Sequence, residues 1–420
     1  LVEIDGSQSG SLGFLVLTDN TVFRGLVINR FSGNGIDIDA TGGGAAGGHV
    51  IRGNFIGINP AGTAAAPNTG YGVFVRSPNN TIGGANPADR NVIVGPGGAF
   101  EACVRFEGDS GATVDGSIVQ GNYLGTNAAG TVGLGGQDGI FIGPGSGVLI
   151  GGTAPGAGNV ISGNAVYGIR LLSPGCIGST ANNTIQGNFI GVDATGTAPL
   201  GNAFGGVSMG CAGATGNQIG GTAAGAGNII AYNGSVQATG GAGVHLDPAA
   251  GTGNAIRANA IFSNVGLGIA LGFIDPVPND PLDPDSGPNN LQNFPIISSA
   301  TPGTGSTHIM GALHSTPSTT YALDFFSNVA CIPFPHEYLE GRTYLGSGVV
   351  ATDGTGTGFF DLTVPVQIGA GEHVTATATD PGGNTSEFSQ RLPFTTAPAS
   401  GAPTGGGGAS GAREPHARPA

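Results

Sequence analysis

The 420-residue chain contains no lysine and no tryptophan, and charged residues make up only 9% of it. Its 26 acidic residues and 12 arginines give a formal net charge of −14 at pH 7. Nucleic acids and anionic membrane surfaces are bound by concentrated basic surfaces, so this charge balance argues against both partners. No apolar run is long enough to span a bilayer, and we expect no membrane insertion.

Cysteine is scarce as well: the chain has four cysteines and no C-x-x-C pair of the kind that binds zinc. Cys176 and Cys211 each follow a strand-like run, GIRLLSPGC and GGVSMGC. If those two runs stack on one another, one disulfide can join the two cysteines. The chain shows no signal peptide and opens inside a strand-like run, LVEIDGSQSG, so we expect that an upstream part is missing.

Glycine, by contrast, is abundant, with 84 of 420 residues. The Gly-x-y period of collagen is absent, so the glycines indicate many tight turns. Phrases of the form GNFIG or GNYLG begin at Gly53, Gly121 and Gly187, in steps of 68 and 66 residues. Phrases containing IGG recur with a similar period, at Ile82, Ile150 and Ile219. A fixed period of this length predicts a repeat architecture.

Between these phrases lie short runs with alternating apolar residues, the pattern of a strand with one buried face. Their buried lead residues are Ile36, Val73, Val104, Ile140, Ile169, Val207, Val244 and Ile269. Two further strand-like pieces separate successive members, so each turn of the chain contains three strands. One coil cannot bury its own apolar side, and the coils must therefore stack. We predict an all-β fold with a three-faced parallel β-helix over residues 1–274.

The sharp corners of such a helix favour glycine and asparagine, which tolerate positive φ. Asparagine follows glycine at Asn34, Asn54, Asn122, Asn164 and Asn188. Stacked in successive coils, these amides are expected to form hydrogen-bonded ladders. Gly-Thr pairs at 62–63, 130–131 and 196–197 mark projecting loops, which are either a recognition edge or tolerated insertions.

The composition changes after residue 274. Residues 275–295 are rich in proline and aspartate and predict a linker or a terminal cap of the solenoid. Longer strand-like runs separated by turns follow over 296–393, a pattern typical of a small antiparallel β-sandwich. Residues 394–420 are of low complexity, and we expect them to be disordered.

Two phrases carry a family resemblance, GNFIGVDATGT at 187–197 and IGGTAPGAGNVISGN at 150–164. They resemble phrases of the bacterial right-handed parallel β-helix repeat proteins, large secreted or cell-surface proteins with the pectate-lyase-like fold. Variants extend this resemblance over roughly residues 1–272. SGPNNLQNFPII, YALDFFSNVAC and VTATATDPGGNTSEFS resemble the immunoglobulin-like module that accompanies such helices. The resemblance implies a right-handed β-helix and an extracellular or cell-surface location in a bacterium, but no particular reaction.

Residues between the buried ones must face outward, which places two columns of side chains on one face. The first column is Asp37, Phe74, Arg105, Phe141, Arg170, Ser208, His245 and Ala270. The second is Asp39, Arg76, Glu107, Gly143, Leu172, Gly210, Asp247 and Gly272. With coils about 4.8 Å apart, the columns run for about 35 Å.

This face is open to three interpretations. In the first, Asp37, Asp39, Phe74, Arg76, Arg105, Glu107, Phe141, Arg170, His245 and Asp247 bind an acidic or neutral glycan through bidentate hydrogen bonds and stacking on exposed phenylalanines. In the second, Asp39, Arg76 and Glu107 form a salt-bridge ladder, and the phenylalanines and arginines stack as cation–π neighbours. In the third, Arg105 or Arg170 is a catalytic base and Glu107 binds a metal.

The catalytic motifs of β-helix enzymes are not found. The Asn-Thr-Asp, Asp-Asp, Gly-His-Gly and Arg-Ile-Lys stretches of polygalacturonases and the Asp-Pro-His-Asp stretch of alginate epimerases are absent, and a lysine base is excluded. An arginine-based lyase with acidic calcium ligands stays open. For calcium, Asp280, Asp283 and Asp285 lie close together in the sequence, although an acidic proline-rich linker is also compatible with simple solvation.

From the sequence we therefore expect a secreted or cell-surface scaffold, adhesin-like and non-catalytic, that binds carbohydrate or matrix glycan along the β-helix face. The alternative is a polysaccharide lyase or glycosidase that acts in the same groove. A third possibility is a purely structural spacer. We expect a monomer that requires no cofactor, with calcium as the candidate ion.

Overall fold

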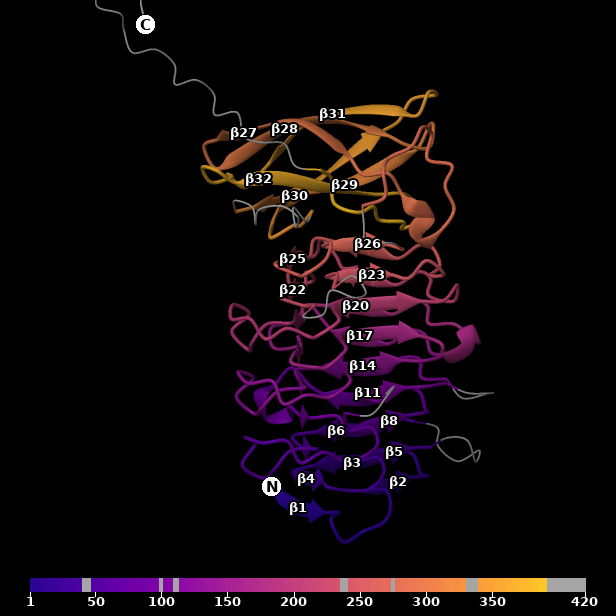
Figure 1. Ribbon diagram of the computed structural model, residues 1–420, viewed down its shortest axis with the longest axis vertical. Helices are drawn as coiled ribbons and strands as arrows, with labels where there is room; N and C mark the ends of the chain where they lie inside the picture. Colours follow the sequence, from indigo (N-terminus) through magenta and orange to yellow (C-terminus); the bar gives the residue numbers. More distant parts are fainter. Residues whose placement is uncertain are drawn as a thin grey trace, which may run out of the picture.

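The structure is a computed structural model that describes residues 1–39, 47–97, 101–108, 113–234, 241–272, 276–329 and 339–390. Within these ranges, residues up to 272 form three parallel β-sheets, here called A, B and C, each built from every third strand of the chain. The coils stack along one long axis, with the N-terminus at one end and the last six strands at the other (Figure 1). The predicted three-faced parallel β-helix is confirmed.

The strands of the β-helix are short. Sheet A contains β1 (Val2–Asp5), β4 (Leu26–Asn29), β7 (Phe55–Ile56), β10 (Val92–Ile93), β13 (Tyr123–Leu124), β16 (Val160–Ile161), β19 (Phe189–Ile190), β22 (Ile229–Ala231) and β25 (Ala260–Phe262). Sheet B contains β2 (Phe14–Val16), β5 (Ile36–Ile38), β8 (Val73–Val75), β11 (Ala102–Phe106), β14 (Asp138–Ile142), β17 (Tyr167–Leu172), β20 (Gly205–Gly210), β23 (Val244–Leu246) and β26 (Ile269–Leu271). Sheet C contains β3 (Val22–Arg24), β6 (Val50–Arg52), β9 (Thr81–Gly83), β12 (Ile118–Gln120), β15 (Leu149–Gly151), β18 (Thr184–Gln186), β21 (Gln218–Gly220) and β24 (Ala255–Arg257).

Alternate residues of each strand fill the interior of the helix. Ile36, Val73 and Val104 are register partners on β5, β8 and β11, and all three are fully buried. Similar columns from sheets A and C complete one continuous apolar core. Burying one such side chain contributes about 1.5–3 kcal/mol, so the stacking of coils is the main stabilising term. The repeated phrases lie two coils apart, since β7, β13 and β19 are alternate strands of sheet A.

Asparagine ladders hold the corners. Asn54, Asn91, Asn122, Asn159, Asn188, Asn228 and Asn259 form one ladder in which each side-chain amide donates to the next side-chain carbonyl. Each rung also binds backbone: the Asn122 backbone N–H donates to Asn159 Oδ1 at 2.9 Å. The predicted ladder is confirmed for Asn54, Asn122 and Asn188, while Asn164 belongs to a second ladder with Asn202, Asn233 and Asn264. The prediction is wrong for Asn34, whose side chain donates to Asp37 and accepts from the Tyr71 N–H, both at 2.9 Å. A buried amide that satisfies both its own and neighbouring backbone groups explains the recurrence of asparagine.

Glycine is required where the chain turns out of these strands. Gly125 follows β13 with φ of +88°, and a Cβ there would lie 2.3 Å from Asn164 Oδ1. Both the positive φ and the close approach exclude a side chain.

The three Gly-Thr loops stack on one another along sheet A. Each is a small hairpin held by the side chain of its first residue, Asn59, Asn127 or Asp193. In the second loop Asn127 Oδ1 accepts from the Thr131 N–H at 2.9 Å. Ala128 N–H donates to Gly62 O at 2.8 Å, and Ala194 N–H donates to Gly130 O at 2.9 Å. Through these contacts the loops support one another along the β-helix, which is a structural role.

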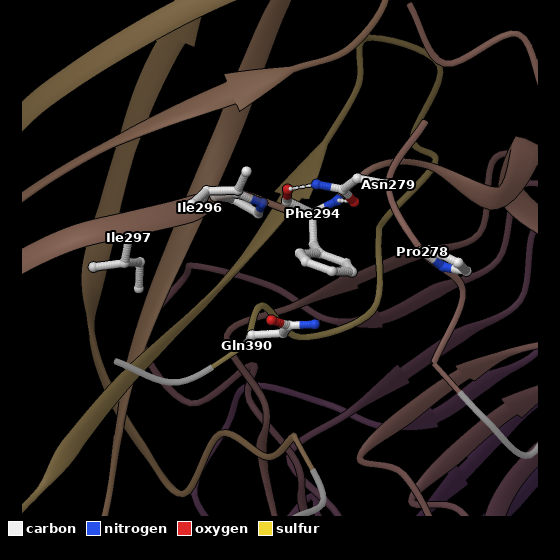
Figure 2. A pocket seen from close by; sticks show the side chains of 7 residues that line it. Pro278, Asn279, Phe294, Ile296, Ile297 and Gln390 are labelled. Carbon is white, nitrogen blue, oxygen red and sulfur yellow. Dashed lines mark hydrogen bonds between the residues drawn. The ribbon is translucent and has the colours of Figure 1, made fainter. Parts of the chain in front are cut away.

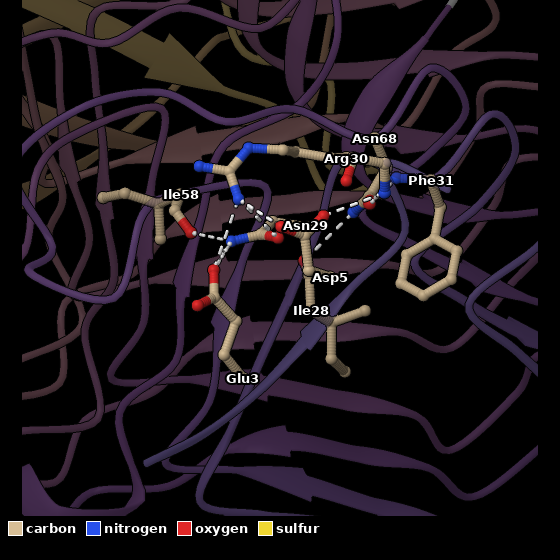
Figure 3. A network of polar contacts seen from close by, with 9 residues as sticks. Glu3, Asp5, Ile28, Asn29, Arg30, Phe31, Ile58 and Asn68 are labelled. Carbon is tan, nitrogen blue, oxygen red and sulfur yellow. Dashed lines mark hydrogen bonds and ion pairs between the residues drawn. The ribbon is translucent and has the colours of Figure 1, made fainter. Parts of the chain in front are cut away.

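The first coils carry a polar network on their outer surface (Figure 3). Arg30 lies between Glu3 and Asp5 at 3.3 and 2.9 Å, and Asn29 Nδ2 donates to Glu3 at 3.0 Å. A backbone hydrogen bond from Ser7 lowers the pKa of Asp5. The charged side chains are exposed, and pairs of this kind stabilise a protein by about 0–1 kcal/mol.

Residues 296–329 and 339–390 form a small antiparallel β-sandwich. In its described part, one sheet contains β27 (Ile296–Gly303), β28 (Ser306–His314) and β31 (Thr357–Val364), and the other contains β29 (Thr320–Asn328), β30 (Thr343–Ala351) and β32 (His373–Thr379). Both sheets contribute to one apolar core that includes Leu313, Tyr321 and Phe360.

The sandwich closes the C-terminal end of the β-helix. Gly341 pairs with Ile261 of β25, and Leu339 O accepts from the Gly268 N–H at 3.1 Å. Glu340 Oε1 accepts from the Asn264 N–H at 3.2 Å, the place that the next asparagine of the ladder would take. The sandwich segment 339–341 thus acts as a substitute for a further coil.

A second sandwich segment completes this closure. Glu387 accepts from the N–H groups of Leu271 and Val277, both at 2.9 Å, and the ring of Phe388 belongs to the β-helix core. Burial raises the pKa of Glu387 to about 7 and that of Glu340 to about 7, against backbone hydrogen bonds that lower both. Arg257 of β24 adds a bidentate ion pair with Asp324 of β29, at 2.9 and 2.8 Å.

Short 3₁₀ turns occur outside the strands, at η1 (Pro87–Asp89), η2 (Pro174–Cys176) and η4 (Pro288–Leu291). Asn183, Asn217 and Asn254 form a third ladder. The predicted linker or cap at 275–295 contains η4, whose Asn289 extends this ladder by accepting from the Asn254 N–H at 2.9 Å. Residue 275 and residues 394–420, predicted to be disordered, lie outside the described residues. Among the described residues, no helix is long and apolar enough to cross a bilayer.

Candidate functional site

Strand pairing places the first predicted column in one row. Asp37, Phe74, Arg105, Phe141, Arg170, Ser208, His245 and Ala270 are successive register partners on adjacent strands of sheet B. Their neighbours one position away on either side point into the core. The outward-facing residues of β5 to β23, together with the residues that directly follow these strands, are called the sheet-B face below.

The centre of this face is an Arg–Phe–Arg stack. The Arg105 guanidinium lies 4.4 Å from the centre of the Phe141 ring, and that of Arg170 lies 5.8 Å from it. The Phe141 ring is 0% exposed and Arg105 is buried. The expectation of exposed phenylalanines is therefore wrong for Phe141, because neighbouring side chains cover its ring. Phe74 is partly exposed and remains accessible to a ligand.

Each arginine of the face is paired with a carboxylate. Arg76 contacts Asp37 at 2.8 Å and Asp39 at 3.4 Å. Arg105 contacts Glu107, the residue that directly follows the same strand, at 2.7 Å. The interpretation as a salt-bridge ladder thus has a structural basis for Asp39 and Arg76. Glu107, the third member of that ladder, pairs with Arg105 instead. Guanidinium groups held in this way are suited to donating hydrogen bonds to a ligand.

The sequence did not indicate Asp138, the most deeply buried acid of the face. Its side chain is 0% exposed and accepts from the Tyr167 N–H at 3.0 Å and from Arg170 at 3.4 Å. Burial raises the pKa of Asp138 to about 6, and Arg170 partly opposes this shift. The only sequence signal was an aspartate directly before the glycine of the run DGIFIG, which alternation alone does not distinguish.

Two tyrosines were also missed. The Tyr71 ring lies 4.9 Å from that of Phe74 and 5.0 Å from the Arg105 guanidinium. The Tyr167 ring lies 5.2 Å from the Arg170 guanidinium. Burial raises the pKa of both hydroxyls. Each tyrosine stands directly before a glycine at the start of its run, in YGVF and YGIR, and this shared position was the available signal.

The far end of the face is less polar. His245 lies one strand beyond Ser208 in the row, four strands from Arg105, which is about 19 Å. Burial lowers the pKa of His245, and the nearby Asp247 carboxylate partly opposes this shift. Asp247 is exposed, and its side chain accepts from the Ala249 N–H at 3.0 Å. The structure therefore separates His245 and Asp247 from the arginine cluster.

The calcium ligands predicted from the sequence were Asp280, Asp283 and Asp285, and the structure does not bring them together as a ligand set. Asp283 accepts hydrogen bonds from Gln292 at 2.6 Å, from the Asn293 N–H at 3.2 Å and from the Ser315 hydroxyl. Burial raises its pKa. Across the described ranges, no group of three or more histidine, cysteine or acidic side chains is arranged to hold a metal. Asp283 fixes the loop to the sandwich instead.

The predicted disulfide is confirmed. Cys176 follows β17, Cys211 follows β20, and their Cα atoms are 5.3 Å apart in a disulfide. The neighbouring strands β17 and β20 bring the two residues together. Cys103 is a buried thiol whose pKa burial raises to about 12, which makes it unreactive. Cys331 lies outside the described residues.

A pocket of about 280 Å³ lies between residues 278–279, residues 294–295, the start of β27 and Gln390 (Figure 2). Its lining includes Pro278, Phe294, Ile297 and Gln390. The Asn279 side chain is occupied by hydrogen bonds to the backbone N–H and carbonyl of Phe294, at 2.9 and 2.8 Å. The pocket thus has few polar groups for a ligand.

A scan against protein-family models found no match to this chain. A search of curated proteins also found no match. Among solved structures, the chain is similar to the tailspike protein gp49 of Acinetobacter baumannii bacteriophage Fri1, described as a capsular polysaccharide depolymerase. The TM-score is 0.21 and the identity 9%, over 87% of this chain and 69% of that one. So low a TM-score supports no conclusion about function, and the fold assignment follows from the strand pairing of this chain.

Proposed function

We propose that this chain is an extracellular or cell-surface scaffold that binds a polysaccharide along the sheet-B face without cleaving it. The observation that carries the proposal is the concentration of polar and aromatic groups on that face. In a chain with only 9% charged residues, three arginines, their carboxylate partners and several aromatic rings gather on β5 to β17.

The chemistry of the face suits sugar hydroxyls. Paired guanidinium and carboxylate groups offer donors and acceptors side by side, and aromatic rings stack on the apolar faces of sugar rings. The stacking of Arg105 and Arg170 on Phe141 fixes both side chains before a ligand arrives, which reduces the entropy lost on binding.

Charge favours a neutral glycan over an acidic one. The carboxylates of the face are Asp37, Asp39, Glu107, Asp138 and Asp247, against the arginines Arg76, Arg105 and Arg170. Each arginine is already paired with an acid of the protein. A uronic acid would meet an excess of negative charge, whereas a neutral sugar would not.

The disulfide supports the extracellular setting, since disulfides persist in oxidising compartments. The family resemblance further suggests that the protein is bacterial and secreted or bound to the cell surface, and that the sandwich is an immunoglobulin-like module. We propose these assignments, the monomeric state and an adhesin-like role together with the binding function.

A polysaccharide lyase or glycosidase acting on the same face is the second candidate. Asp138 is the observation that favours it, because a carboxyl group with a pKa of about 6 is within the range of general acids. Full burial of that side chain argues against direct contact with a substrate. For this reason we place binding before catalysis.

The proposal is tested by affinity electrophoresis of the purified chain in native gels that contain dextran, galactomannan, xylan, alginate or polygalacturonate. We expect retardation by a neutral polysaccharide, and a loss of at least about tenfold in affinity for Phe74→Ala and Glu107→Gln. Arg30→Ala is the matched control, because Arg30 is ion-paired but directly follows β4 of sheet A, away from the sheet-B face. No retardation by any polysaccharide, or equal binding by all variants, would refute the proposal.

The same polysaccharides, incubated with the chain and calcium, separate binding from catalysis. New reducing ends, or ultraviolet absorbance from unsaturated ends, that disappear in Arg105→Ala and Arg170→Ala would establish the enzyme. The binding proposal predicts no product.

A further inference from the structure

The outer face of the sandwich sheet β27–β28–β31 carries an exposed apolar strip. Phe359 of β31 is 82% exposed, the largest exposure among the large apolar side chains of the described residues. Its register partner on β28 is Ala312, whose partner on β27 is the exposed Ile296. The exposed Met310 lies two residues before Ala312 on the same face. These four residues are called the Phe359 strip below.

The strip is short. Ile296, Ala312 and Phe359 occupy three adjacent strands, so the row is about 10 Å wide. The small side chain of Ala312 leaves a shallow gap between the larger side chains of Ile296 and Phe359. The opposite sides of these strands bury Ile309, Leu313 and Phe360 in the sandwich core, so the exposed ring is not needed for folding.

Polar groups surround this apolar row on the same face. His308 contacts Asp361 at 2.5 Å, and His314 lies 3.2 Å from the Thr357 hydroxyl. These side chains stay exposed or partly exposed and retain further hydrogen-bonding capacity.

We infer that the Phe359 strip is a second carbohydrate-binding site, which takes the apolar face of a neutral sugar ring. A ring stacked on Phe359 would be flanked by His314 and Thr357 on one side and by Asp361 on the other, within reach of its hydroxyls. The apolar area is too small for a stable protein partner: the four side chains of the strip together expose about 300–400 Å². A stable protein interface needs about 800 Å² per partner.

Phe359→Ala, Phe359→Trp and Val349→Ala test this site in the full chain. Val349 is the matched control, because it is a 65% exposed apolar residue on β30 of the opposite sheet. The probes are native gels with dextran, galactomannan or xylan and pull-downs on insoluble cellulose and chitin. We expect at least about tenfold weaker binding for Phe359→Ala, unchanged or tighter binding for Phe359→Trp, and less than about twofold change for Val349→Ala.

The outcomes distinguish this site from the sheet-B face. Loss of binding in Phe74→Ala alone, with Phe359→Ala unchanged, would overturn the inference and leave the proposed function in place. Loss of binding in Phe359→Ala alone would support the inference and overturn the proposed function of the sheet-B face. If no probe binds the unchanged chain, or if it sediments as a dimer that Phe359→Ala converts to a monomer, the strip is not a sugar site.

Discussion

The junction between the β-helix and the sandwich gives the sharpest energetic prediction. Asp324 is 1% exposed and receives two hydrogen bonds from Arg257, whose side chain is 24% exposed, and one from Ser347 at 2.5 Å. Arg257→Ala would leave a buried carboxylate with a single hydroxyl donor. Removing one partner of a buried pair costs about 3–5 kcal/mol. Since Ser347 remains and water reaches the Arg257 site, we expect about 3 kcal/mol.

Urea unfolding followed by circular dichroism measures this cost, because the chain has no tryptophan for fluorescence. The control is Arg30→Ala, which removes an exposed pair and is expected to cost less than about 1 kcal/mol. The double variant Arg257→Ala with Asp324→Asn should recover part of the loss, since it no longer buries a charge. An Arg257→Ala variant within about 0.5 kcal/mol of the unchanged chain would refute the reasoning.

Three further predictions concern stability. Cys176→Ser opens a disulfide that closes a 35-residue separation, and chain entropy predicts a loss of about 4 kcal/mol, measured in urea against a Cys103→Ser control; an equal loss in both would contradict it. Asn122→Ala leaves donors and acceptors of two ladder neighbours unpaired and should cost about 2–3 kcal/mol, whereas a neutral result would show that water replaces the amide. The pKa values of Glu340 and Glu387 rise from 4.5 to about 7 on folding, so the native state binds more protons between these values. Their contribution to stability therefore falls as pH rises from about 4.5 to 7, and Glu387→Gln should reduce the drop in Tm between pH 5 and pH 8; an unchanged drop would contradict the shift.

Periodicity explains why the β-helix was predictable from the sequence. Each coil repeats the same apolar alternation, so Ile36, Val73 and Val104 could be placed in one column without a structure. The asparagine ladders followed from the same logic, although the intervening members Asn91 and Asn159 lie in coils whose phrases differ. A structural pattern that repeats in every coil can be recognised from the sequence alone.

The burial of outward-pointing side chains and the contacts between segments distant in sequence were not predictable in the same way. Alternation shows that Phe141 points away from the core, but only the structure shows that Arg105 and Arg170 bury its ring. Asp138 precedes the alternating part of its strand, where the rule of two no longer holds. The closure of the helix by Glu340 and Glu387 joins segments more than 70 residues apart, which no sequence period marks.

The candidate sites differ in the same respect. The row of the sheet-B face was expected from the sequence, while its role as a binding surface stays a prediction. The acidic run at 280–285 suggested calcium because aspartates close in sequence were assumed to converge, yet Asp283 accepts hydrogen bonds from Gln292 and from Ser315 of the sandwich. Sequence proximity does not determine the direction of side chains in a loop.

The most direct test of the central claim is a crystal structure of the chain with an oligosaccharide prepared from the neutral polysaccharide that retards it most. The account predicts sugar density on the sheet-B face, in contact with Phe74, Arg76 and Glu107. Sugar bound at other positions only, with this face empty, would contradict it.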